Sequence, residues 1–128
     1  MLIEKRPEIV QLPDHGPTFE KYPAITVLIG DRIVFCGGII YLWSRVGQAW
    51  LYTVPDMIRY RVSTFPIIKR FVDTTRVALN LERIQTSVQE DFEEGHRLMK
   101  HLGFKFEGTH PKYINGLTYV SYAWVRED

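Results

Sequence analysis

The stretch Asp91-Phe92-Glu93-Glu94-Gly95-His96-Arg97-Leu98-Met99-Lys100-His101-Leu102-Gly103-Phe104 carries the clearest structural signal in this chain. Its acidic residues come first and its basic residues last, which is the arrangement that a helix dipole favours. Asp91 is the expected N-cap, and Gly103 is expected to end the helix in a left-handed conformation. Apolar and small residues at helical spacing predict an inward stripe of Phe92, Gly95, Leu98, Met99 and Leu102.

Strands are predicted on both sides of this helix. Arg83–Val88 precedes it. Phe104–Glu107 follows it, and in this second segment polar residues alternate with aromatic ones. Asn115-Gly116 favours a tight hairpin turn, after which Leu117–Val125 is typical of a long aromatic strand.

A second helix is predicted upstream, because the apolar period changes after Val62. Ser63 or Thr64 is expected to cap it, and Pro66 is tolerated in a first turn, where the missing N–H has no helical partner. Its apolar face is expected to contain Phe65, Ile68, Val72, Thr75 and Leu79.

An antiparallel meander is predicted before that helix. Ala24–Ile29 and Ile33–Trp43 are rich in β-branched and apolar residues, and Gly30-Asp31 between them is a good two-residue turn. Gly37-Gly38 indicates a bulge or a close backbone approach. Gln48–Thr53 is the third strand of the meander.

The first 23 residues contain four prolines and are expected to be mostly extended or looped. We therefore expect one α+β domain over residues 1–128, with an irregular segment over 1–23. Its order is three strands, helix, strand, helix and two strands.

Composition excludes several classes of protein. The 128 residues carry a net charge of +1, which disfavours electrostatic binding to nucleic acid. A single cysteine, Cys36, cannot form an internal disulfide. No apolar run approaches the ~20 residues of a membrane helix, and the start of the chain lacks the pattern of a secretory signal. A cytoplasmic location is expected.

The stretch Asp91–Phe104, followed by Glu107-Gly108, resembles the GNAT (GCN5-related N-acetyltransferase) superfamily, in which a helix ends in Leu-Gly-Phe before a strand with Glu-Gly. Ala49–Thr53 is similar to the third strand of small phage-encoded GNAT-like proteins, including internal virion proteins. The resemblance covers Ala24–Val125. It implies a GNAT-like acyl-CoA N-acyltransferase fold: a mixed, mostly antiparallel sheet with helices on its faces and a shortened N-terminal part.

The resemblance also implies a function, which is acetyl transfer from acetyl-CoA to a primary amine of a protein or small molecule. In such enzymes the third and fourth strands splay apart around pantetheine, and the pyrophosphate lies at the next helix N-terminus. The corresponding positions here are Tyr52, Thr53 and Val54 for pantetheine. For phosphate they are Ser63 and Thr64, with charge from Arg59 and Arg61.

Three departures from the family pattern support an alternative. Pro55–Thr64 contains no glycine where the family has a glycine-containing phosphate loop. Met99 stands at the position of the family's proton-donating tyrosine, and Phe92 replaces its asparagine. The alternative is a catalytically degenerate GNAT-like protein that works through protein–protein contacts, as a virion component or a modulator of a host protein. A phage-encoded protein would lie in the host cytoplasm or in the virion.

Candidates for proton transfer are few. Asp56 is a candidate general base at the end of the third strand, and Tyr113, together with Tyr119 and Tyr122, is a candidate replacement for the missing acid. No metal is expected, because His96 and His101 are five residues apart and therefore off the i, i+4 spacing. Finally, an exposed edge of the aromatic last strand could pair with a second copy and form a homodimer.

Overall fold

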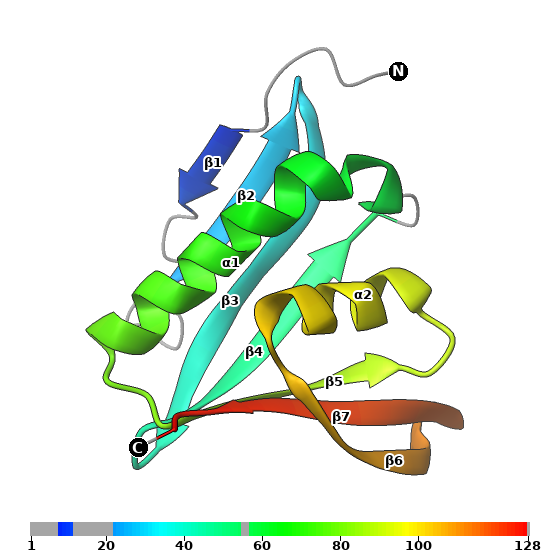
Figure 1. The fold of residues 1–128 in the computed structure, drawn as a ribbon. Coiled ribbons are helices and arrows are strands. Elements are labelled where there is room, and N and C mark those ends of the chain that lie inside the picture. The colour runs from blue at the N-terminus through cyan, green and yellow to red at the C-terminus, as the bar shows by residue number, and fades with distance from the viewer. Residues whose placement is uncertain (1–7, 12–21, 55–56, 128) are drawn as a thin grey trace.

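The computed structural model describes residues 8–11, 22–54 and 57–127, which form one seven-stranded sheet and two α-helices (Figure 1). The sheet order is β1-β2-β3-β4-β5-β7-β6. In chain order the elements are β1 (Glu8–Gln11), β2 (Ala24–Ile29), β3 (Arg32–Trp43), β4 (Val46–Thr53), the 3-10 turn η1 (Met57–Tyr60), α1 (Arg61–Ala78), β5 (Arg83–Gln89), α2 (Glu93–Leu102), β6 (Lys105–Ile114) and β7 (Leu117–Val125).

The strand pairing confirms the predicted α+β class. β2, β3 and β4 form the expected antiparallel meander, and β7 is antiparallel to both of its neighbours, β5 and β6. The one parallel pair among the described strands is β4 with β5. β1 pairs with β2, so part of the segment expected to be irregular is a strand.

Both helices cover the same face of the sheet (Figure 1). The chain crosses from β4 to β5 through α1, and then from β5 to the parallel β6 through α2. Both crossovers move across the sheet in one direction. Since such crossovers are right-handed, they put their helices on one side. The other face carries no described helix and is called the helix-free face below.

The hydrophobic core lies between the sheet and the two helices. The predicted stripe of α2 is confirmed, because Gly95, Leu98, Met99 and Leu102 are all buried. On α1 the buried residues include Phe65, Ile68, Val72 and Thr75, as expected. Large strand residues complete the core: Val27, Val34, Ile39 and Ile84 are each at most 1% exposed.

The predicted caps of α1 and α2 are wrong. The chain is already helical from Met57, so α1 begins at Arg61, and Ser63 and Thr64 lie inside its first turns. Asp91 does not cap α2, because its carboxylate accepts a hydrogen bond from the Gln89 side chain at 2.7 Å and the N-cap is Phe92. The predicted end of α2 is confirmed, since Gly103 has φ 82°.

Gly37 and Gly38 allow a close backbone approach rather than a bulge. The β3–β4 register runs through both residues without a shift. A Cβ atom on Gly38 would lie 2.7 Å from the carbonyl oxygen of Pro23, and one on Gly37 would lie 2.8 Å from that of Trp50. Both distances are below any normal Cβ contact, so these positions require glycine.

The last strand is not at an edge of the sheet. β7 lies between β5 and β6, and therefore has no free edge for the expected pairing with a second copy. The prediction of a homodimer through that edge is wrong because β6 folds back along β7 after the Asn115-Gly116 turn, where both residues have positive φ. None of the described helices is both long and apolar enough to span a membrane.

Candidate functional site

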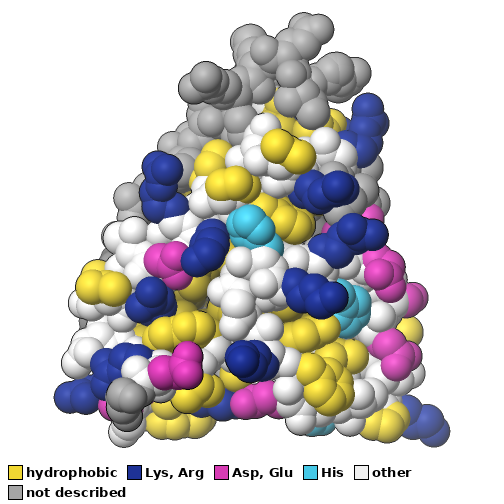
Figure 2. Space-filling view, viewed as in Figure 1, with side chains coloured by type: hydrophobic (Ala, Val, Ile, Leu, Met, Phe, Trp, Pro, Cys, Tyr) yellow, Lys and Arg dark blue, Asp and Glu magenta, His cyan; other side chains and the backbone are white. Residues whose placement is uncertain are grey.

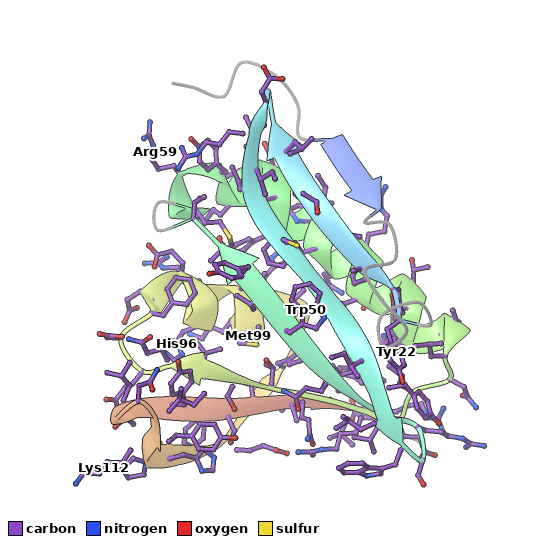
Figure 3. All side chains as sticks on the ribbon, turned by 180° about the vertical axis from the view of Figure 1, so that it is seen from behind. Tyr22, Trp50, Arg59, His96, Met99 and Lys112 are labelled. Carbon is purple, nitrogen blue, oxygen red and sulfur yellow. The ribbon has the colours of Figure 1, made fainter. Side chains whose placement is uncertain are left out.

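β4 and β5 are paired over only part of their length. Their ladder joins Val46–Gln48 to Arg83–Gln85 and stops there, although β4 continues to Thr53 and β5 to Gln89. At the point of separation the Thr86 hydroxyl donates to the carbonyl oxygen of Ala49 at 2.9 Å. Beyond this bond the two strands diverge, as Figure 3 shows from the helix-free face.

One row of backbone groups on β4 faces this opening. Strand residues direct their N–H and C=O groups alternately to the two neighbouring strands. The Ala49 carbonyl faces β5, while the Val54 N–H donates to Val34 of β3 at 3.3 Å. By this alternation the N–H and C=O groups of Leu51 and Thr53 face the opening.

The residues predicted to contact pantetheine differ in the direction of their backbone groups. Of the three residues expected to supply backbone groups, only Thr53 directs them into the opening. Tyr52 is paired with Cys36 of β3, and the Val54 N–H is bound to the Val34 carbonyl. Leu51 was missed because the direction of its backbone depends on the pairing of β4 with β3, which periodicity does not show.

The opening is a cleft of about 680 Å³. It is lined from both faces of the sheet: Ala49, Leu51 and Val88 belong to the helix-bearing side, and Trp50 and Tyr119 to the helix-free side. Phe92, at the start of α2, and Tyr113 and Ile114, at the tip of the β6–β7 hairpin, also line it. The cleft therefore lies between the two strands and is lined by side chains from both faces of the sheet.

Cationic side chains lie near the helix that follows β4. Arg59 in η1 and Arg61 at the start of α1 are both exposed, and the Arg59 guanidinium lies 6.0 Å from the centre of the Tyr60 ring. Figure 2 shows further Lys and Arg side chains over this helix-bearing face. Positive charge at the beginning of a helix favours phosphate groups.

Ser63 and Thr64 do not form the expected cap for phosphate. Ser63 is half-buried, and Thr64 is completely buried. The Thr64 hydroxyl has no hydrogen-bond partner in the part of the chain that the structure describes. Arg59 and Arg61 are the exposed arginines at this helix start within the described part of the chain.

Met99 is a core residue. It is 1% exposed and lines a small apolar cavity together with Leu51, Phe71 and Phe104. In Figure 3 it is seen on α2, behind the opening between β4 and β5. A thioether has no proton to donate, so this position supplies packing alone.

Among the tyrosines considered as proton donors, two reach the cleft. Tyr113 and Tyr119 line it, with their ring centres 5.8 Å apart, and Tyr113 is 55% exposed. Asp56, the candidate base, lies outside the described residues.

Tyr122 belongs instead to a pair with His96, which was not predicted from the sequence. The ring Nε2 of His96 lies 2.8 Å from the carbonyl oxygen of Glu90, and its Nδ1 lies 2.6 Å from the Tyr122 hydroxyl. A carbonyl only accepts, so Nε2 carries the proton and Nδ1 accepts from the tyrosine. Burial, and then the charge of Glu93, raise the pKa of Tyr122. This pair lies outside the cleft lining and ties α2 to β7.

A polar network on the helix-free face connects three strands. Arg83 donates to both carboxylate oxygens of Glu107, and its Nε donates to the Gln85 side chain at 2.9 Å. Gln85 in turn donates to the Gln48 side chain at 3.4 Å. The network ends at the last paired residues of β4 and β5, and therefore stabilises the closed end of the cleft. Among the described residues no group of three or more His, Cys, Asp or Glu gathers to hold a metal ion.

Comparisons with known proteins give structural matches alone. No family model matches the chain, and no curated protein matches it in sequence. The ribosomal-protein-S5-alanine acetyltransferase of Vibrio fischeri superposes with a TM-score of 0.72 at 16% identity, covering 84% of this chain and 63% of that one. A GNAT-family acetyltransferase from Bacillus anthracis superposes with a TM-score of 0.67 at 15% identity, covering 82% of this chain and 67% of that one. The fold is the GNAT fold.

A third GNAT-fold match is yncA of Salmonella typhimurium, solved with its cofactor acetyl-CoA. It has a TM-score of 0.67 at 13% identity, with 84% of this chain and 66% of that one covered. The chain thus spans less than two thirds of the length of the first of these structures. Identities of this size show the fold alone. The solved structures named here are bacterial, and the resemblance to phage-encoded proteins stays a prediction.

Proposed function

We propose that this protein is an N-acetyltransferase that transfers the acetyl group of acetyl-CoA to a primary amine. The observation that carries the proposal is the separation of β4 from β5 beyond Gln48 and Gln85, with a cleft of about 680 Å³ between them. Strands that part inside a sheet leave backbone donors and acceptors that need partners. A pantetheine arm contains amide groups of the kind that such an edge pairs with.

The residues of this chain fit acetyl-CoA at two points. The C=O group of Leu51 and the N–H and C=O groups of Thr53 would bind the pantetheine amides along β4, which leaves the Leu51 N–H for the thioester. Arg59 and Arg61, both exposed beside the start of α1, would attract the phosphates. The two points are consecutive along the chain, so one extended ligand can reach both.

The chemistry needs no covalent enzyme intermediate. The amine nitrogen attacks the thioester carbonyl carbon, the new C–N bond forms, the C–S bond breaks, and the proton lost by the amine is balanced by one gained by the CoA thiolate. The protein holds the two reactants in contact, and a Leu51 N–H directed at the carbonyl oxygen would stabilise developing charge.

Proton transfer is assigned by position. Tyr113 lines the cleft and carries a hydroxyl, so we assign it the return of a proton to the leaving thiolate. Asp56, outside the described residues, is the candidate for removing the proton of the amine. Tyr113→Phe is expected to lower kcat and to leave acetyl-CoA affinity unchanged.

Calorimetric titration with acetyl-CoA tests the proposal. Saturable binding is expected, and a ligand at ~100 times its Kd stabilises the fold by ~2.7 kcal/mol, which a thermal shift would detect. The double variant Arg59→Ala/Arg61→Ala is expected to weaken binding at least tenfold. Arg70→Ala, an exposed arginine further along α1, is the matched control and is expected to bind normally.

Absence of heat at high micromolar acetyl-CoA would contradict acetyl transfer. It would favour the alternative, a GNAT-fold protein that acts through contacts with another protein. A stoichiometric partner that still binds the Arg59→Ala/Arg61→Ala variant would then support that alternative.

A further inference from the structure

The cleft has a second row of unpaired backbone groups, on β5. The Glu90 N–H donates to the Thr118 carbonyl of β7 at 2.9 Å, so even-numbered residues of β5 face β7. By alternation, Ser87 and Gln89 face the cleft. The Gln89 carbonyl accepts from the Phe92 N–H at 3.0 Å. The ladder with β4 ends at Gln85, so the N–H and C=O of Ser87 and the N–H of Gln89 lie beyond the pairing of β5 with β4 among the described residues.

This second row is separate from the row on β4. The pantetheine arm, under the proposed function, uses Leu51 and Thr53. The groups on β5 are then available to the other substrate. At such a strand edge every second residue presents its N–H and C=O groups, and another polypeptide backbone has the matching spacing of acceptors and donors.

The tip of the β6–β7 hairpin overhangs the same part of the cleft. Lys112 has φ 54°, an uncommon conformation for a residue with a long side chain, and the β6–β7 register shifts between His110 and Ile114. Irregularities of this kind redirect side chains. Here Tyr113 contacts both His110 and Tyr119, with ring centres 5.4 Å and 5.8 Å away, and its ring lines the cleft together with Ile114.

The described side chains on this part of the cleft are neutral. They are the amides Gln48 and Gln89, the hydroxyl of Ser87, and the rings and aliphatic chain of the hairpin tip. A neutral lining accommodates an unprotonated amine better than an ammonium ion. At pH 7 about one in ten α-amino groups is unprotonated, against about one in 2,500 lysine side chains.

We propose that the acceptor is the amino terminus of a polypeptide, whose first residues pair with Ser87 and Gln89 of β5 and pack a side chain against Tyr113, Ile114 and Tyr119. This inference rests on the proposed function. It narrows the acceptor from any primary amine to the α-amino group of a polypeptide's first residue.

Turnover on matched acceptors tests it, with release of free CoA as the readout. The acceptors are a lysine-free decapeptide amide with a free amino terminus, an N-acetylated decapeptide amide with one lysine, and spermidine. The free amino terminus is expected to give at least tenfold higher kcat/KM than either of the others. N-methylation of the peptide's second and third amides is expected to raise KM about tenfold with little change in kcat, because it removes donors to β5.

Two variants separate the hairpin's contribution from folding. Tyr119→Leu removes a ring from the cleft and is expected to raise the peptide KM several-fold, whereas Tyr119→Phe keeps the ring and is expected to retain the wild-type KM. Acetyl-CoA affinity, measured by calorimetry, is expected to stay unchanged in both.

Preference for spermidine or for the lysine peptide, with acetyl-CoA binding intact, would overturn this inference and leave the proposed function in place. An unchanged KM for the N-methylated peptide would overturn the pairing with β5. Absence of acetyl-CoA binding by the wild-type protein would overturn the proposed function and this inference together.

Discussion

The Thr86 hydroxyl donates to the carbonyl oxygen of Ala49 across 2.9 Å, and this bond lies where β4 and β5 part. Thr86 is 5% exposed, whereas Ala49 is half-buried. The Ala49 carbonyl is the first carbonyl of β4 that faces β5 beyond the end of the ladder, and the Thr86 hydroxyl takes the place of a backbone donor there. The Thr86 side chain thus supplies a hydrogen bond to the Ala49 carbonyl at the point where the parallel pairing ends.

We predict that Thr86→Val lowers the free energy of unfolding by about 0.5–1.5 kcal/mol, because the Ala49 carbonyl loses the hydrogen bond from the Thr86 hydroxyl. Urea denaturation measures the change. Thr86→Ser keeps the hydroxyl and is the control, expected to lie between the wild type and Thr86→Val. Equal stability of Thr86→Val and the wild type would show that the bond does not stabilise the closed end of the cleft.

Thr64 gives the opposite prediction. Its hydroxyl is buried without a partner among the described residues, and valine has the same shape without the polar atom. Thr64→Val is expected to raise the free energy of unfolding by about 1 kcal/mol. Thr64→Ala, the control, also removes the hydroxyl but leaves a cavity, and is expected to lower stability. A loss of stability in Thr64→Val would mean that the hydroxyl has a partner in the folded protein.

Gly38 is predicted to tolerate no side chain. An added Cβ would lie 2.7 Å from the carbonyl oxygen of Pro23, which is backbone and cannot swing away. Gly38→Ala is expected to cost about 1–3 kcal/mol by overpacking. The matched control is Gly108→Ala, where the nearest atoms are at 3.6 Å and a change within about 0.5 kcal/mol is expected. Thermal unfolding of the two variants distinguishes them, and equal melting temperatures would refute the close approach.

The Arg83–Glu107 pair makes stability depend on pH. The hydrogen bond from Arg83 lowers the pKa of Glu107 below its ordinary value. The pair therefore stabilises the fold above the unfolded-state pKa of ~4.3, and this contribution disappears as the pH falls through the lowered value. Both side chains are about a third exposed, at 33% and 37%, so the contribution is at most about 1 kcal/mol.

Urea unfolding of Glu107→Gln and the wild type at pH 7, 5, 4 and 3 measures this contribution. The two stabilities are expected to differ at pH 7 and to converge as the pH approaches 3. Glu127→Gln removes the same charge at an exposed position beyond β7 and controls for net charge. A difference that persists undiminished at pH 3 would contradict the role of the charged pair.

Local signals predicted much of this fold. The stripe of α2, its end at Gly103 and the turn at Asn115-Gly116 depend on residues close in sequence, and all three are confirmed. The N-caps failed because competing partners decide them: Asp91 is held by the Gln89 side chain. The edge position expected for the last strand failed because only the return of β6 along β7 determines the order of strands.

The candidate site was predictable as a region and not in its details. The resemblance pointed to the end of β4, where the strands do part. Which β4 residues face the opening depends on the register with β3, and so Leu51 replaces Tyr52 and Val54 there. Tyr113 reaches the cleft through an irregular hairpin, and the local signal for its bend at Lys112 is the preceding Pro111, since proline within a strand marks an edge or a bulge.

The register between β3 and β4 extends from Tyr41–Gly47 to Phe35–Thr53, beyond the point where β5 departs. One edge of β4 is thus fixed by a complete ladder while its other edge stays open. The open edge is a rigid template, whose backbone entropy has already been lost in folding. A ligand that pairs with it meets a preorganised surface, so ordering of the strand subtracts little from the affinity.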